Sequence, residues 1–244
     1  MIQQNLISVD QASRWFGARC AVDSISFNIG RGEILGFLGP NGAGKSTTMQ
    51  MICGVLAASS GTITVSGHDI VEAPKQAKRC IGYLPERPPL YLDLTVNEYL
   101  EYCAGLRQVP AAGRREAIAG AQQRCGLEQA GNRLIGNLSQ GFRQRVGIAQ
   151  AVLHAPDIVI LDEPTVGLDP NQIIGIRDLI RDLGREHSVI LSTHILSEVQ
   201  GLCDRVIIIN HGSLVLDASM ASITDLEQTF VSLTTGAGIH GEQP

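Results

Sequence analysis

A glycine-rich segment at residues 39–46 has the residue types and spacing of a phosphate-binding loop. It reads Gly39-Pro40-Asn41-Gly42-Ala43-Gly44-Lys45-Ser46, with Thr47 next, and fits the pattern G-x-x-x-x-G-K-[ST]. Glycines let backbone N–H groups point inward around a phosphate. Lys45 can reach the β- and γ-phosphates, and the Ser46 hydroxyl can ligate Mg²⁺. The segment therefore predicts a nucleoside triphosphate site, although kinases, GTPases and ATPases all share this pattern.

Two adjacent carboxylates follow an apolar run at residues 158–161. We expect Asp162 to hold Mg²⁺ through water beside Ser46. We expect Glu163 to polarise the attacking water as a general base. The alternative is a pair of solvated acids at the start of a loop, which the presence of the phosphate-binding loop makes less favourable.

These side chains must be positioned by an α/β framework with helices inserted in its middle. Apolar or alternating runs predict strands at 25–29, 33–38, 63–65, 158–161, 189–191 and 206–209. Helical patterns occupy 46–53, 96–106, 114–125, 140–153 and 172–183. Ser139 is a natural N-cap for the helix that begins at residue 140.

Composition narrows the class of protein. The chain has 244 residues, 44% of them hydrophobic and 18% charged, which suits one globular α/β domain. Its net charge of −5 argues against nucleic-acid binding as the main task. No apolar run approaches the roughly 20 residues of a membrane span, and the first residues do not read as a signal peptide. The six cysteines have no metal-binding spacing and are expected to be reduced and mostly buried.

A second motif points to one family. Residues 138–145, Leu-Ser-Gln-Gly-Phe-Arg-Gln-Arg, resemble the L-S-x-G-x-x-Q-R signature of ATP-binding cassette (ABC) proteins. The resemblance extends over about residues 6–233, and the motifs occur in the family's order. It implies a P-loop NTPase (RecA-like) core at about 1–87 and 155–220, with a small antiparallel β subdomain. It also implies an inserted α-helical subdomain at about 88–154, all within one nucleotide-binding domain (1–235), and a flexible tail at 236–244.

The resemblance assigns further site residues. His194 matches the switch histidine, which contacts the γ-phosphate and acts beside Glu163 in catalysis. Ser139 and Gly141 would bind the nucleotide of a partner cassette, and Asp169 would lie in the D-loop at the dimer contact. Phe16 stands where an aromatic ring stacks on adenine, although the adjacent Trp15 competes for that role. Glu86 replaces the family's glutamine, and its carboxylate is still an acceptable Mg²⁺ ligand.

The family also implies a function. The chain resembles an ATPase subunit that binds ATP and Mg²⁺, pairs with a second cassette, most simply its own copy, and drives a separate transmembrane permease. Residues 83–86 and 168–172 are similar to the exporter subgroup of gliding-motility and copper-enzyme-maturation ATPases, which implies export. Residues 87–94 form the expected docking neighbourhood. The expected location is cytoplasmic, peripheral on the cytoplasmic face of the cell membrane, with no direct membrane insertion and no nucleic-acid partner.

The sequence leaves one other function open and disfavours a second. One is a soluble cassette ATPase that acts in translation or DNA repair. The chain lacks the second cassette typical of the translation proteins and the long insertions typical of the repair proteins. The other is a regulatory module that does not hydrolyse ATP, which would require a change at Glu163, His194 or Ser139. All three residues are intact.

Overall fold

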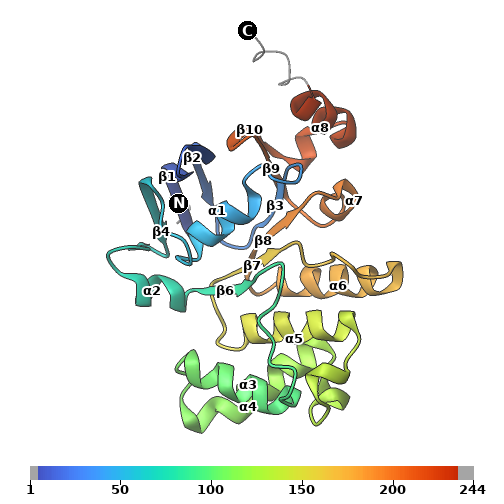
Figure 1. The fold of residues 1–244 in the computed structure, drawn as a ribbon. Helices are drawn as coiled ribbons and strands as arrows, with labels where there is room; N and C mark the ends of the chain where they lie inside the picture. Colours follow the sequence, from blue (N-terminus) through green and yellow to red (C-terminus); the bar gives the residue numbers. More distant parts are fainter. Residues whose placement is uncertain (1–4, 236–244) are drawn as a thin grey trace.

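The computed structural model describes residues 5–235, and a six-stranded sheet forms its centre (Figure 1). In spatial order the strands are β10 (Ser213–Ser219), β9 (Arg205–Asn210), β3 (Ile34–Leu38), β8 (Ser188–Thr193), β7 (Ile158–Asp162) and β6 (Ile81–Leu84). Only the pairing of β10 with β9 is antiparallel. The carboxyl ends of β3, β7 and β8 therefore meet at one edge of the sheet, where ligands bind in open α/β folds.

The central strands are buried on both faces. Every residue of β3, β7 and β8 is buried. A parallel strand covered on both sides has a nearly continuous apolar sequence. This explains why the sequence predicts β7, β8 and β9 with ends that differ from the observed ones by only one or two residues.

The expected small antiparallel sheet is present, with four strands. Their order is β2 (Arg19–Ile29), β1 (Ile7–Phe16), β4 (Ser60–Val65) and β5 (His68–Asp69). The predicted alternation at 25–29 is confirmed, because Ile25, Phe27 and Ile29 are buried while the residues between them are exposed. Strand β1 is not predicted from the sequence, because register shifts along it interrupt the period of two on which strand prediction depends.

Three helices fill the segment between β6 and β7: α3 (Val96–Leu106), α4 (Ala111–Cys125) and α5 (Gln140–Val152). Thr95 caps α3 in a reciprocal capping box with Glu98. Helix α4 begins three residues earlier than predicted, directly after Pro110, because its first turn has no apolar periodicity to reveal it. In Figure 1 these helices lie together at the end of the molecule opposite α8 (Leu226–Thr235).

The remaining helices pack around the two sheets. They are α1 (Lys45–Ile52), α2 (Pro74–Arg79), α6 (Pro170–Leu183) and α7 (Leu196–Val199). Helix α6 starts at Pro170, two residues before the predicted start. The reason is that Asp169 supplies the N-cap and proline suits the first helical position.

The core consists of two apolar clusters on opposite faces of the central sheet. Val159, Leu161 and Leu191 face the helical insertion, whereas Ile160 and Ile190 face α1 and the antiparallel sheet. Alternate residues of the same buried strand therefore join the sheet to both of its neighbours.

The cysteines and the apolar character of the helices can both be compared with the sequence predictions. All six cysteines are free and four of them are buried, as predicted. Within residues 5–235, no helix combines the length and the apolar character needed to cross a bilayer. The flexible tail expected at 236–244 lies outside the described residues.

Replacement of Gly82 tests the contact between β6 and α5. A Cβ atom at this position would lie 2.2 Å from the carbonyl oxygen of Ala151. We expect Gly82→Ala to lower the free energy of unfolding by roughly 1–3 kcal/mol, because backbone would have to move. Gly120→Ala is the matched control on α4, where a Cβ would have no neighbour within 4 Å. It should stabilise the protein by up to about 1 kcal/mol. Urea titrations of both variants measure the difference, and equal effects would contradict the argument.

Candidate functional site

The loop between β3 and α1 is held in a conformation that requires glycine. Gly42 and Gly44 have φ values of 79° and 112°. A Cβ at Gly39 would lie 2.4 Å from the Ile209 carbonyl oxygen, and one at Gly44 would lie 2.6 Å from that of Ala21. The first turn of α1 then contributes N–H groups that have no intrahelical acceptor. Loop and helix together form an anion-binding concavity.

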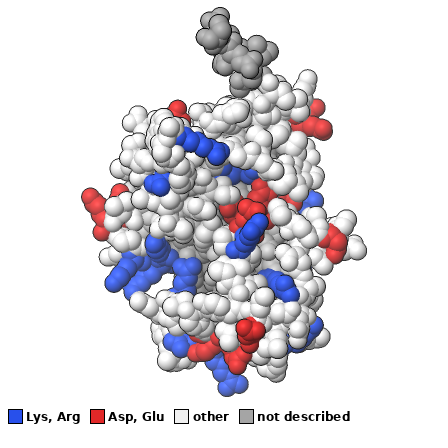
Figure 2. Space-filling view, viewed as in Figure 1, with Lys and Arg blue, Asp and Glu red and all other residues white. Residues whose placement is uncertain are grey.

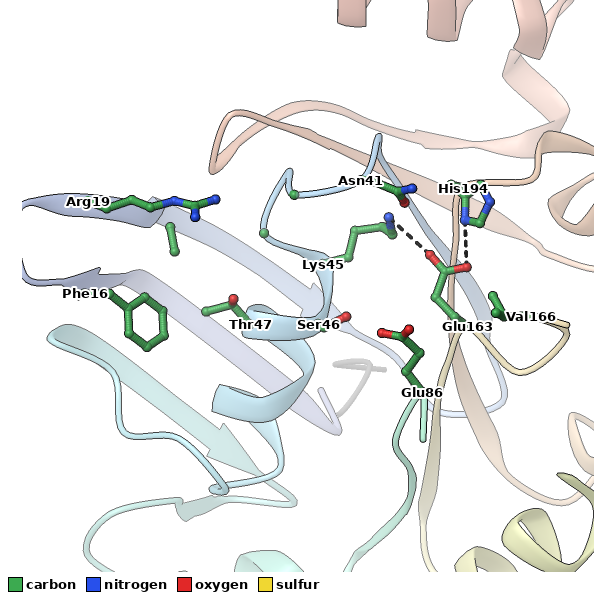
Figure 3. A pocket seen from close by; sticks show the side chains of 13 residues that line it. Phe16, Arg19, Asn41, Lys45, Ser46, Thr47, Glu86, Glu163, Val166 and His194 are labelled. Atoms are coloured by element: carbon green, nitrogen blue, oxygen red, sulfur yellow. Dashed lines mark hydrogen bonds and ion pairs between the residues drawn. The ribbon is translucent and has the colours of Figure 1, made fainter. Parts of the chain in front are cut away.

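Lys45 is buried at the centre of this site. Its ammonium group donates to the carbonyl oxygen of Gly39 at 2.8 Å and to that of Pro40 at 3.3 Å. It also pairs with Oε1 of Glu163 at 3.2 Å, and both side chains are less than a tenth exposed. The charge of Lys45 therefore faces the loop and the end of β7 at the same time (Figure 3).

Ser46 and Asp162 form an oxygen pair that fits a Mg²⁺ ion. Ser46 Oγ donates to Oδ1 of Asp162 at 3.1 Å, and Ser192 Oγ donates to the same oxygen. Burial raises the pKa of Asp162 above its ordinary value, although both hydroxyls favour the charged form. A hydroxyl and a carboxylate are the hard oxygen donors that Mg²⁺ prefers, so the residues present suit this ion.

Glu163 is held in a strained backbone conformation at the end of β7. Its φ is 49°, which is uncommon for a residue other than glycine. Its N–H donates to both the carbonyl oxygen and the Oγ of Ser192, each at 3.1 Å. Its Oε2 lies 2.8 Å from Nδ1 of His194. The structure thus brings the two predicted catalytic side chains into direct contact (Figure 3).

These groups open onto a cavity of about 440 Å³. The cavity size suits a small ligand. The predicted residues that line it are Phe16, Asn41, Gly42, Gly44, Lys45, Ser46, Thr47, Glu86, Glu163 and His194. In Figure 3, Phe16 lies on one side of Lys45 and Ser46, and the carboxylates of Glu86 and Glu163 lie on the other. Trp15 does not line the cavity, and the guanidinium of Arg14 lies 4.7 Å from the centre of the Phe16 ring. Of the two adjacent aromatic rings, Phe16 is therefore the one that lines the cavity, and its stacking on a base stays a prediction.

Ser139, Gly141 and Asp169 are not brought to this cavity. Ser139 Oγ accepts from the N–H of Phe142 at 3.4 Å and caps α5 as predicted. Asp169 Oδ1 accepts from the N–H groups of Asn171 and Gln172, each at 3.0 Å, and caps α6. A Cβ at Gly141 would lie 2.8 Å from the Gln172 side chain, which gives this glycine a packing role within the chain. The expected phosphate contacts of Ser139 and Gly141 stay a prediction.

Sequence reasoning misses four residues of the site. Arg19, Ala21 and Val166 line the cavity, and Ser192 holds both Asp162 and Glu163. The only available signal was the position of Ser192 at the end of an apolar run. Arg19 and Ala21 belong to β2, whose approach to the loop no local pattern reveals.

Comparisons with known proteins agree on one family. The family model described as ABC transporter matches residues 22–166. The ABC transporter ATP-binding protein NatA of Bacillus subtilis is 40% identical over 86% of this chain and 86% of its own length. The bacitracin transport ATP-binding protein BcrA of Bacillus licheniformis is 39% identical over 86% of this chain and 68% of its own. A solved structure of an ATP-binding subunit of an ABC transporter superposes with a TM-score of 0.84 and 29% identity, covering 93% of this chain and 99% of that one.

Substitution of Phe16 tests its contact with the base. Loss of base stacking costs about 1–3 kcal/mol, so Phe16→Ala should weaken nucleotide binding roughly 5- to 150-fold. Trp15→Ala is the matched control, because both side chains are 48% exposed and only Phe16 lines the cavity. Calorimetric titration with a non-hydrolysable ATP analogue measures both. A larger loss in Trp15→Ala would transfer the role to Trp15.

Proposed function

The chain belongs to the ABC transporter family as an ATP-binding, ATP-hydrolysing subunit, and we propose that it drives a separate membrane permease as half of a cassette dimer. The observation that carries the proposal is the meeting of Lys45, Ser46, Asp162, Glu163 and His194 at one sheet edge. A nucleoside triphosphatase needs these groups together, because it must hold phosphates, a cation and a nucleophilic water at once.

The site supports a defined division of roles. The loop amides and Lys45 bind the phosphates, while Ser46, Asp162 and Glu86 hold Mg²⁺. The ion, when bound, neutralises charge that develops on the phosphate oxygens. Glu163 accepts a proton from the attacking water, and His194 orients Glu163 and contacts the γ-phosphate. Since Lys45 now pairs with Glu163 at 3.2 Å, a phosphate that takes over Lys45 would free one Glu163 oxygen for the water.

The second half of each site comes from a partner cassette. Ser139 caps α5 and Gly141 lies in its first turn, where the free N–H groups and the helix dipole favour an anion. They do not line the cavity of their own chain. A two-fold pair of identical chains would place each signature against the other's nucleotide, with Asp169 at the contact, and would make both sites equivalent.

A groove beside the helical segment suits the permease. It has a volume of about 500 Å³, and its lining combines aromatic and apolar side chains, several of them on α3, with basic side chains, three of which are on α2. Its apolar lining includes Pro89, Tyr91, Tyr99, Tyr102 and Leu106, and its basic lining consists of Lys75, Lys78, Arg79 and Arg107. Figure 2 shows Lys and Arg side chains gathered over α2. We propose that an amphipathic permease segment bearing acidic residues docks here, so that the helical unit at 88–154 transmits the motion of the dimer.

The permease determines where the subunit lies in the cell and in which direction the substrate is transported. The chain would lie peripherally on the cytoplasmic face of the membrane, and resemblance to the exporter subgroup favours export. The relatives favour transport over the alternative of translation or DNA repair, because BcrA is a bacitracin transport ATP-binding protein.

Glu163→Gln separates binding from hydrolysis. We expect it to keep nucleotide affinity within about threefold, to lower turnover at least 100-fold, and to accumulate an ATP-bound dimer, since the amide cannot accept the proton from water. Light scattering after gel filtration with ATP and Mg²⁺ measures the dimer. A variant that stays monomeric and active would overturn the mechanism.

Recovery of the binding partner distinguishes a role in membrane transport from a soluble role in translation or DNA repair. Tagged protein should recover an integral membrane protein from detergent-solubilised membranes of its source. Lys78→Glu combined with Arg79→Glu should reduce this recovery at least tenfold, because both residues line the basic side of the groove. The ATPase activity of the isolated double variant serves as the control for folding. Recovery of ribosomes or DNA instead would favour the soluble alternative.

A further inference from the structure

A buried carboxylate, Glu198, lies next to the catalytic edge without lining the cavity. It is 2% exposed and belongs to α7. Thr165 donates its hydroxyl to Oε1, and Thr193 donates its hydroxyl to Oε2 at 2.6 Å. Both threonines are buried as well. Burial of an ionised carboxylate is unfavourable unless its oxygens are hydrogen-bonded, and here each oxygen receives one hydroxyl.

The two threonines come from the two segments that carry the catalytic pair. Thr165 follows Glu163 by two residues, and Thr193 directly precedes His194. Thr193 Oγ1 also accepts from the N–H of Ile195 at 3.0 Å, which fixes the turn around His194. One carboxylate therefore joins the loop after β7 to the end of β8, where the loop that carries His194 begins.

This connection lies where the backbone is strained. Glu163 has a φ of 49°, and strained conformations persist only where the surroundings hold them in place. On its amino side the N–H of Glu163 is held by Ser192. On its carboxyl side, the first side chain anchored in a buried network is Thr165, through Glu198.

We propose that Glu198 is a positioning residue for ATP hydrolysis. By holding Thr165 and Thr193, it fixes the strained backbone of Glu163 and keeps the Glu163 carboxylate 2.8 Å from the His194 imidazole. Glu198 does not line the cavity, so its loss should change the chemical step and not ATP binding. This inference rests on the proposed function, since it concerns the hydrolysis that the site performs.

Kinetics of the purified full chain test the positioning role. Thr165→Val and Thr193→Val preserve shape and remove one hydroxyl each. Each should lower kcat at least tenfold with KM and the Kd for ATP within twofold of wild type. Thr165→Ser keeps the donor and should recover kcat to within about threefold of wild type.

A double variant tests whether Thr165 and Glu198 act through one connection. Thr165→Val combined with Glu198→Ala should be no more than twofold slower than Glu198→Ala alone, because both changes break the same connection. Glu227→Ala removes an exposed acid on α8 and is the control.

Hydrogen exchange supplies a readout independent of activity. Amides of residues 163–168 and 193–195 should exchange faster in Thr165→Val and Thr193→Val than in wild type, because the connection between the two loops is lost. The proposal is overturned if both valine variants keep kcat within twofold, if KM rises in step with the loss of kcat, or if exchange is unchanged. If wild type itself does not hydrolyse ATP, the proposed function fails, and the exchange data still decide whether Glu198 joins the two loops.

Discussion

The buried ion pair between Lys45 and Glu163 joins the two halves of the catalytic edge. Lys45 starts α1 and Glu163 directly follows β7, and their charged atoms meet at 3.2 Å with both side chains almost fully buried. Such a pair is unfavourable to desolvate and persists only when its remaining atoms find partners. The carbonyl oxygens of Gly39 and Pro40 accept hydrogen bonds from Lys45, and the His194 imidazole contacts the second carboxylate oxygen of Glu163. The loop, the strand order and the position of His194 therefore have to be correct together.

The same edge concentrates strain. Glu163 has left-handed backbone geometry, and Gly42 and Gly44 of the loop adopt φ values that other residues avoid. The rigid sheet beneath makes this tolerable, because β3, β7 and β8 are buried along their whole length and are joined in continuous parallel register. The stability of the apolar core thus supports an edge that is locally unfavourable.

The predicted nucleotide-binding residues of one chain fall into two groups, those that lie at its own cavity and those that lie away from it. The cavity contains the loop, the acids and the switch histidine, whereas Ser139 and Asp169 cap their own helices away from it. A capped helix start is already folded and oriented before it meets a ligand, so docking a second chain requires little further ordering. A helix N-terminus of this kind can serve the fold of its own chain and the phosphates of a partner.

The sequence by itself determined the chemistry and much of the framework. Three of its signals are local patterns: the glycine spacing, the two acids after an apolar strand, and Ser139 before a helix. Each can be interpreted from the sequence because it depends only on backbone sterics or helix capping between neighbouring residues. The structure alone decided which distant groups meet. Strand order and register bring the Ser192 hydroxyl to Asp162 and place Glu198 between two threonines. They also decide that Phe16, and not Trp15, lines the cavity. Strand β1 was missed for a related reason, because its bulges break the alternation that a sequence can display. Period and composition report on neighbours along the chain, whereas the site is made of neighbours across the sheet.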